Sequence, residues 1–186
     1  MRYSSNHKAE TRKRIIGEAS RRFRKDGVEG TGLVPLMKAL GLTHGGFYAH
    51  FASKDALVEA SLASAAEQAF ERWPEPRDSD ELLAFVASYL SPEHRDNPDE
   101  GCPLPSLCAE LGLRGSPSDT SDIVVQRMTQ RLEGAELRSA PPERSLVALA
   151  AMVGAITLAR AVKDPAASDQ ILAAVRSAIR APSQET

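Results

Sequence analysis

Apolar side chains recur every three or four positions along most of this 186-residue chain, which is the pattern of amphipathic helices. The first stripe consists of Ile15, Ile16, Ala19 and Phe23. A second stripe consists of Leu33, Leu36, Met37 and Leu40. Gly27 and Gly41 follow the two stripes, so we expect one helix from Thr11 to Gly27 and another from about residue 31 to residue 41. Pro35 fits the first turn of the second helix, where a missing N–H is least costly.

Two further helix starts follow directly. Thr43 is a natural N-cap for a short third helix, because its hydroxyl accepts a hydrogen bond from a free backbone N–H. Phe47 and Phe51 lie four positions apart and are expected to point inward against the first two helices. Ser53 is the expected cap of a fourth helix, which runs to about Trp73 and stops at the prolines that follow.

Helical spacing continues to the end of the chain. The remaining apolar stripes begin at Leu82, Leu104, Ile123, Leu146 and Ile171. They predict helices over about residues 80–90, 104–111, 123–137, 141–161 and 166–181, which brings the expected total to about nine. Residues 91–101 are rich in Pro, Asp and Asn and are expected to form a loop. No segment alternates as a strand does, so the predicted fold class is all-α.

Composition agrees with a helical fold. The chain is 42% hydrophobic but only 5% aromatic, so its core must be built mainly from Ala, Leu, Val and Ile. The longest apolar run, residues 146–159, has 14 residues, whereas a membrane span needs about 20, and we interpret the run as a buried helix. The first residues lack the apolar stretch of a secretion signal. We therefore expect a cytoplasmic protein with no membrane partner.

Charge is distributed unevenly along the chain. Residues 1–55 hold eleven Lys and Arg against five acids, a formal charge of +6, while the remainder carries −8. A basic module attached to an acidic body is typical of a polyanion-binding domain with a separate partner domain. Solvated helix faces could produce the same excess without any nucleic acid.

The usual signatures of catalysis and metal binding are missing from the sequence. It contains no Gly-x-Ser-x-Gly, phosphate-binding loop, Cys-x-x-Cys or Gly-x-Gly-x-x-Gly. His44 and His50 are six apart, with no Cys or acid at ligand spacing, so no metal and no cofactor are expected. An enzyme that uses one of these histidines or His94 would lack a partnering acid or nucleophile, so we do not expect an enzyme.

The chemistry that is present lies between Gly41 and Phe51. Two short helices joined by a glycine turn are the pattern of a helix-turn-helix, which places its second helix in the major groove of DNA. His44 and Tyr48 lie four apart and are expected to share its outward face. Gly45 and Gly46 each cost on the order of 0.5–1 kcal/mol in a helix. Either DNA approaches the backbone closely there, or the glycines relieve crowding against a neighbouring helix.

Four spaced motifs carry a family resemblance: Phe23-Arg24-Lys25-Asp26-Gly27, Leu40-Gly41-Leu42-Thr43, Phe47-Tyr48-Ala49-His50-Phe51 and Ser53-Lys54-Asp55-Ala56-Leu57. Over residues 10–62 the chain resembles the tetracycline-repressor (TetR) family. The resemblance implies a three-helix helix-turn-helix DNA-binding domain at residues 1–55 and a helical effector-binding and dimerisation domain at residues 56–186. It also implies a transcriptional regulator, usually a repressor, that binds a pseudo-palindromic double-stranded DNA operator and is released by a small-molecule effector of unknown identity.

The resemblance also assigns sites and an interface. The family's DNA-contacting positions fall on Thr31, Thr43, His44, Gly45, Tyr48, His50 and Lys54. Val34 and Pro35 stand where family members often have basic or hydroxyl side chains, so fewer contacts are expected from the second helix. Small residues in 141–161 and 166–181 suit an internal core as well as an interface, and the resemblance favours a homodimer through these helices. Arg160 interrupts their apolar face and is expected to pair with an acid of the partner subunit or with an anionic ligand.

The two cysteines leave one alternative open. Cys108 lies on an apolar stripe and is expected to pack in the core. Cys102 precedes Pro103 at a helix start, where thiolates are favoured, so a redox- or electrophile-sensing regulator is an alternative. A constitutive helix-turn-helix protein without an effector is another.

Overall fold

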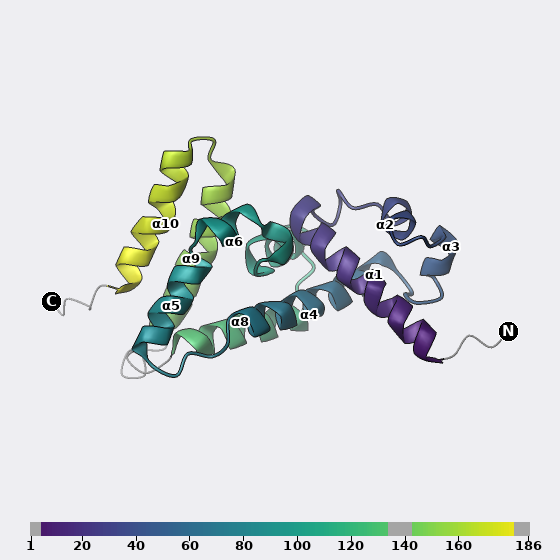
Figure 1. Ribbon diagram of the computed structural model, residues 1–186, viewed down its shortest axis with the longest axis horizontal. Coiled ribbons are helices and arrows are strands. Elements are labelled where there is room, and N and C mark those ends of the chain that lie inside the picture. Colours follow the sequence, from purple (N-terminus) through teal and green to yellow (C-terminus); the bar gives the residue numbers. More distant parts are fainter. Residues whose placement is uncertain (1–4, 134–142, 181–186) are drawn as a thin grey trace. The chain divides into compact units, whose positions relative to one another are not determined.

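The computed structural model describes residues 5–133 and 143–180, and the described chain is helical throughout (Figure 1). It divides into two compact units. The first contains Met1–Ala69 and Pro98–Ser121, and the second contains Phe70–Asn97 and Asp122–Thr186. The expected all-α class is confirmed. We expected the DNA-binding domain to end at residue 55. The compact units divide elsewhere, because the first unit continues to Ala69 and also includes Pro98–Ser121.

The first unit begins with the three expected helices. α1 spans Ser5–Asp26, α2 spans Leu33–Ala39 and α3 spans His44–Phe47, and α4 (Lys54–Arg72) follows them. α1 starts six residues before the expected Thr11, because its first turns carry polar side chains that leave no apolar period to detect. Gly27 and Gly41 end α1 and α2 with φ of 78° and 71°, a conformation that glycine adopts without strain.

The core of the first unit includes residues from far along the chain. From α1 to α4 it is formed by Ile15, Ala19, Phe23, Val28, Leu36, Met37, Phe47, Phe51, Leu57, Val58 and Leu62. Leu107 and Leu111 complete the same buried cluster. They belong to a segment that comprises the 3₁₀ turn η1 (Pro98–Glu100), the π-helical turn η2 (Leu104–Cys108) and α7 (Ala109–Leu113). A segment expected in the second domain therefore helps to build the first.

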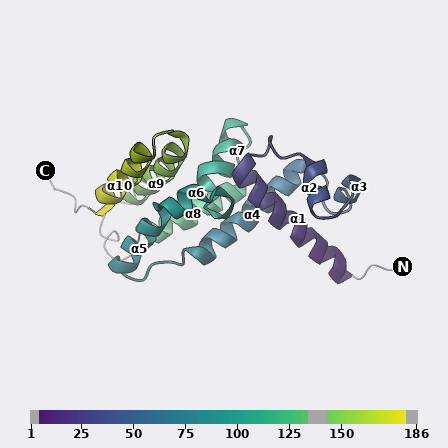
Figure 2. The ribbon, with the colours of Figure 1, turned by 45° about the horizontal axis from the view of Figure 1, so that its top comes forward.

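The second unit consists of α5 (Ser79–Tyr89), α6 (Pro92–Asp96), most of α8 (Asp119–Leu132), α9 (Glu143–Ala161) and α10 (Pro165–Arg180). Figures 1 and 2 show α9 and α10 side by side, as their close packing requires. The expected loop at 91–101 is wrong over residues 92–96, where α6 begins with a Ser91 cap and Pro92. One short turn is too brief to give a periodic apolar signal. Of the expected helices, residues 134–137, 141–142 and 181 lie outside the described residues.

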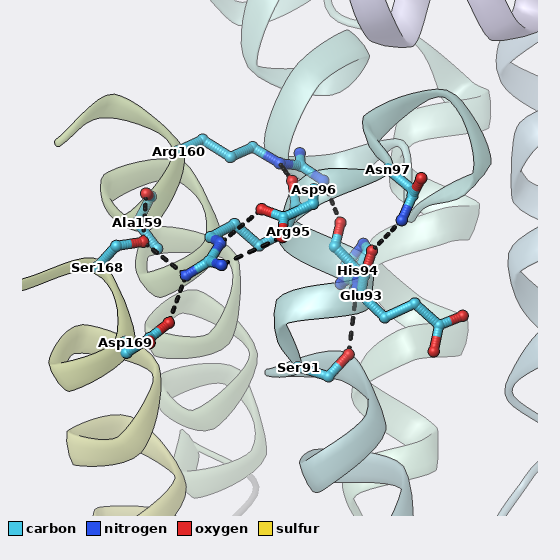
Figure 3. Close-up of polar contacts among 10 residues, drawn as sticks. All are labelled: Ser91, Glu93, His94, Arg95, Asp96, Asn97, Ala159, Arg160, Ser168 and Asp169. Carbon is cyan, nitrogen blue, oxygen red and sulfur yellow. Dashed lines mark hydrogen bonds and ion pairs between the residues drawn. The ribbon is translucent and has the colours of Figure 1, made fainter. Parts of the chain in front are cut away.

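α6 is tied to the last two helices by arginines (Figure 3). The Arg95 guanidinium donates to Asp169 at 2.6 Å and to the Ser168 hydroxyl at 2.9 Å, and the Asp96 carboxylate beside it raises the pKa of Arg95. Arg160 donates to the carbonyls of His94 and Arg95 at 2.7 and 2.9 Å. These carbonyls at the end of α6 hold the Arg160 side chain within the chain. Its expected pairing with an acid of the partner subunit or with an anionic ligand stays a prediction.

α9 is, among the described helices, the one long and apolar enough to cross a membrane. Length and composition alone are weak evidence, because the core helix of a soluble protein passes the same test. A third of its most apolar window is buried within the chain, and the rest presents apolar side chains at the surface.

Candidate DNA-binding site

The third helix is a single, well-capped turn. α3 contains only His44–Phe47, and Thr43 precedes it in an extended conformation. The Thr43 hydroxyl accepts the Gly46 N–H at 3.2 Å, which confirms the expected cap. Because α3 is only one turn long, its helix dipole is small, and its surface must act through individual side chains and the exposed backbone.

The aromatic residues of this region divide between the core and the surface as expected. Phe47 and Phe51 are buried, with their rings stacked at 5.6 Å between centroids. His44 and Tyr48 lie together on the opposite side, edge to face at 5.7 Å. Tyr48 is 60% exposed, an unusual fraction for a large aromatic side chain, and a phenol hydroxyl on an exposed side chain can donate to a phosphate or a base.

The two glycines of α3 have different surroundings. A Cβ added at Gly45 would meet no atom of the chain within 4 Å, so this glycine relieves no crowding inside the described structure. A Cβ at Gly46 would lie 3.3 Å from the Thr43 hydroxyl oxygen and would press on the cap. Gly46 therefore has a structural reason to be small, whereas the described residues give Gly45 no such reason.

Comparison with known proteins supports a helix-turn-helix in this part of the chain. The sequence model described as "Bacterial regulatory proteins, tetR family" matches residues 15–61, which contain α2 and α3 and most of α1. The transcriptional regulator UidR of Escherichia coli (strain K12) is 26% identical over 137 residues, which cover 68% of this chain and 69% of that protein. A TetR transcriptional regulator from Chloroflexus aurantiacus superposes with a TM-score of 0.74 at 25% identity, covering 94% of this chain and 96% of that one. This chain belongs to the tetR family.

Two more distant structures share the same fold. Escherichia coli NemR in its reduced form is 22% identical with a TM-score of 0.72, covering 92% of this chain and 95% of that one. A tetR-family regulator from Cytophaga hutchinsonii is also 22% identical, with a TM-score of 0.73 and coverage of 96% and 98%. Likeness at this level of identity shows that the all-helical fold is shared.

The structure brings most of the expected contact residues of this tetR-family protein to one surface. Thr43, His44, Gly45 and Tyr48 are exposed on or beside α3, and Lys54 is half-buried at the first position of α4. Thr31 differs, because it is 3% exposed and its hydroxyl donates to the Gly27 carbonyl at 2.8 Å. Its side chain fixes the turn between α1 and α2 and does not reach the surface.

His50 lies in the turn after α3 and is half-buried. Its Nδ1 is buried and has no hydrogen-bond partner among the described residues. Burial lowers the pKa of His50 below its usual value, and the charges of Lys8, Arg12 and His7 lower this pKa further. Burial and these charges both favour the neutral form of the ring.

The helix-turn-helix is held in place by residues that the sequence did not reveal as functional. The Glu110 carboxylate of α7 accepts the backbone N–H of Val28 at 2.7 Å and of Glu29 at 3.2 Å, directly after the α1 stop at Gly27. Arg24 is buried on α1 and donates to the Gly101 carbonyl at 2.6 Å.

Arg24 also donates to Gln68 of α4 at 2.9 Å. Burial lowers the pKa of Arg24 to about 10, against the opposing charge of Asp99, and the guanidinium stays charged at pH 7. These contacts join residues 44 to 82 positions apart, so no local pattern could have found them.

Neither cysteine faces the surface of α3. Cys102 is completely buried, while Cys108 is half-buried and receives the Ser121 hydroxyl at 3.6 Å. Burial raises the pKa of Cys108 to about 11, which makes it an unreactive packing residue as expected. Among the described residues no group of three or more His, Cys, Asp or Glu could hold a metal ion.

Proposed function

We propose that this tetR-family regulator is a repressor that binds a pseudo-palindromic operator as a homodimer and is released by a small-molecule effector. Gly45 carries the proposal: it occupies a surface helix turn with open space where a side chain would be, between the exposed His44 and Tyr48. A glycine with no internal reason to be small is accounted for by a DNA backbone or base edge that approaches it closely. We propose that it acts in the cytoplasm, and by binding rather than by catalysis.

The DNA contacts divide by chemistry. Thr43, His44 and Tyr48 present polar groups toward the major groove, while His50 and Lys54 flank α3 and supply phosphate contacts. We assign Thr31 an indirect role, since its hydroxyl is already bound within the α1–α2 turn. Phosphate contacts release counterions, so operator affinity should fall steeply with salt.

A binding titration tests the proposal. The protein is titrated into labelled duplexes from its own upstream region and into shuffled duplexes of equal composition, at low and at physiological salt. We expect at least one upstream duplex to bind ~10³-fold more tightly than its shuffled control, with two subunits per duplex. Equal affinity for upstream and shuffled DNA would show that the protein binds DNA without sequence specificity, contrary to the proposal.

The surface of α9 supports the proposed dimer. Exposed apolar residues recur at helical spacing along it at Val147, Ala150 and Leu158 and continue to Val162 just after its end, with Gly154 open between them; Leu146 is exposed as well. Ala173, Ala174 and Ala178 add an exposed strip of small side chains on the neighbouring α10. An apolar stripe on two adjacent helices fits a four-helix contact between two copies of the chain.

Replacing Leu158 by Glu should therefore yield a monomer. The side chain is 57% exposed in a single chain, so folding should be retained. Sedimentation should show the wild type as a dimer and Leu158→Glu as a monomer. Operator affinity should fall ~10²-fold or more, because a monomer binds one half-site without a linked second subunit on the other. Gln130→Glu adds the same charge on exposed α8 and should remain dimeric. A monomeric wild type at micromolar concentration would overturn this arrangement.

An effector site is supported by a groove within the second unit. The groove has a volume of about 530 Å³ and lies between the end of α4 and α5, and its lining includes Arg72, Trp73, Arg77, Phe85 and Ser88. α4 continues from the DNA-binding unit to this groove, so a ligand there acts on the same helix that follows the helix-turn-helix. A ligand shifts operator binding only if it prefers one arrangement of that helix.

Trp73 offers a direct readout, since it is the sole tryptophan of the chain and its indole N–H donates to Ser88 at 3.0 Å. Fractions of a metabolite extract that release the operator should also change Trp73 fluorescence. The same fractions should have a weaker effect on Ser88→Ala. Release without any fluorescence change would place the effector elsewhere, and no release by any fraction would favour a constitutive DNA-binding protein.

The redox alternative rests on Cys102. Its complete burial shields the thiol from oxidants in this conformation. If the regulator senses oxidants through Cys102, then peroxide should lower operator affinity in the wild type and leave Cys102→Ser unchanged. Equal responses of the two proteins would remove this alternative.

A further inference from the structure

The end of α1 that extends beyond the core is basic on one side. Lys8 and Arg12 are four positions apart and continue the helical stripe that carries the buried Ile15 and Ala19. The stripe thus changes from apolar to cationic where the core ends. Glu10, the acid between the two cations, lies on the opposite side of the helix.

This basic end meets the turn after α3. The Arg12 guanidinium lies 4.7 Å from the centroid of the Phe51 ring, next to His50. The charged groups that act on His50 are Lys8, Arg12 and His7, all from α1. Lys8 and Arg12 are exposed, and neither forms an ion pair with an acid among the described residues. Cations from α1 therefore gather with a neutral imidazole whose Nδ1 has no hydrogen-bond partner among the described residues.

We propose that Lys8, Arg12 and His50 form a second phosphate-binding cluster, which grips the operator backbone at the end of α3 opposite to Thr43. The inference rests on the proposed operator binding and adds residues of α1 to it. A phosphate fits the cluster because it neutralises mutually repelling cations and accepts hydrogen bonds from a guanidinium and an ammonium. With the phosphate bound, the charged form of His50 is favoured, so DNA binding takes up a proton at this ring.

The test is the salt dependence of operator affinity for Lys8→Gln and Arg12→Gln. Each removes one phosphate contact per subunit, or two per dimer, so the slope of log K against log salt should become shallower by ~2, with an affinity loss of ~10-fold or more near 0.1 M salt. Lys13→Gln is the matched control: it removes the same charge from the same exposed turn of α1 but lies off the stripe. Its slope should stay within ~0.5 of the wild type.

His50→Gln gives a second readout. Because the pKa of His50 is lowered in the free protein and raised by a bound phosphate, wild-type affinity should increase as pH falls from 7.5 to 6.0. His50→Gln should lose the share of this increase that comes from protonation of His50. His44→Gln keeps His50 and should retain that share.

The outcomes separate the two proposals. If the wild type binds its operator while Lys8→Gln and Arg12→Gln match Lys13→Gln, the cluster is overturned and the regulator stands. If the wild type binds no duplex even at low salt, both are overturned. Lys8 is exposed near the start of α1, so the result for Lys8→Gln does not depend on a stability change.

Discussion

Gly45→Ala should fold at least as stably as the wild type and bind its operator ~10- to 100-fold more weakly. Alanine is favoured over glycine in a helix by roughly 0.5–1 kcal/mol, and the added methyl meets no atom of the chain within 4 Å. In the complex the same methyl would stand between α3 and the DNA, where a misplaced methyl typically costs ~1–3 kcal/mol. Thermal unfolding and fluorescence anisotropy with the operator duplex measure the two effects on one sample.

Equal or higher stability together with weaker operator binding would distinguish a lost DNA contact from damage to the fold. Gly17→Ala is the control, because Gly17 also has open space at its Cβ but lies in the middle of α1. It should gain stability without losing affinity. Gly46→Ala should lose both, since its methyl presses on the Thr43 cap. Wild-type affinity in Gly45→Ala would show that nothing approaches this turn.

Glu110→Ala should destabilise the DNA-binding unit by ~1–3 kcal/mol. The substitution leaves the Val28 and Glu29 N–H groups without their carboxylate, and hydrogen bonds to a charged group are worth about 1.5–3 kcal/mol each when buried. Since Glu29 is exposed, most of the effect should come from Val28. For a chain of this length each kcal/mol corresponds to roughly 2–4 °C in Tm.

Operator affinity should fall in parallel, because the turn after α1 loses the group that fixes it. Glu110→Gln keeps one carbonyl acceptor and should lie between the wild type and Glu110→Ala. Glu71→Ala removes an exposed carboxylate of α4 and should change neither property. Unchanged stability in Glu110→Ala would mean that this carboxylate does not hold the turn.

The helix-turn-helix could be predicted because its determinants are local. The caps at Thr43 and Ser53, the stops at Gly27 and Gly41, and the inward Phe47 each depend on residues within about four positions. Side-chain preference and helix period therefore suffice to place them.

The features that could not be predicted from the sequence depend on contacts between residues far apart in the chain. Leu107 and Leu111 form an ordinary apolar stripe, and nothing in that stripe states which unit it packs against. The burial of Thr31 follows from its hydrogen bond to the positive-φ Gly27, a turn geometry that the resemblance does not specify. Two adjacent glycines in a short helix stand out in the sequence, but only the structure shows that a Cβ at Gly45 has open space among the described residues while a Cβ at Gly46 does not.

Guanine methylation protection on the operator shows whether α3 enters the major groove, since guanine N7 lies there. We expect two protected patches on one face of the duplex, separated by about 34–36 Å or one helical turn, one for α3 of each subunit. Both patches should disappear together in Gly45→Ala at concentrations that saturate the wild type. A bound complex in which every major-groove guanine stays reactive would contradict the account.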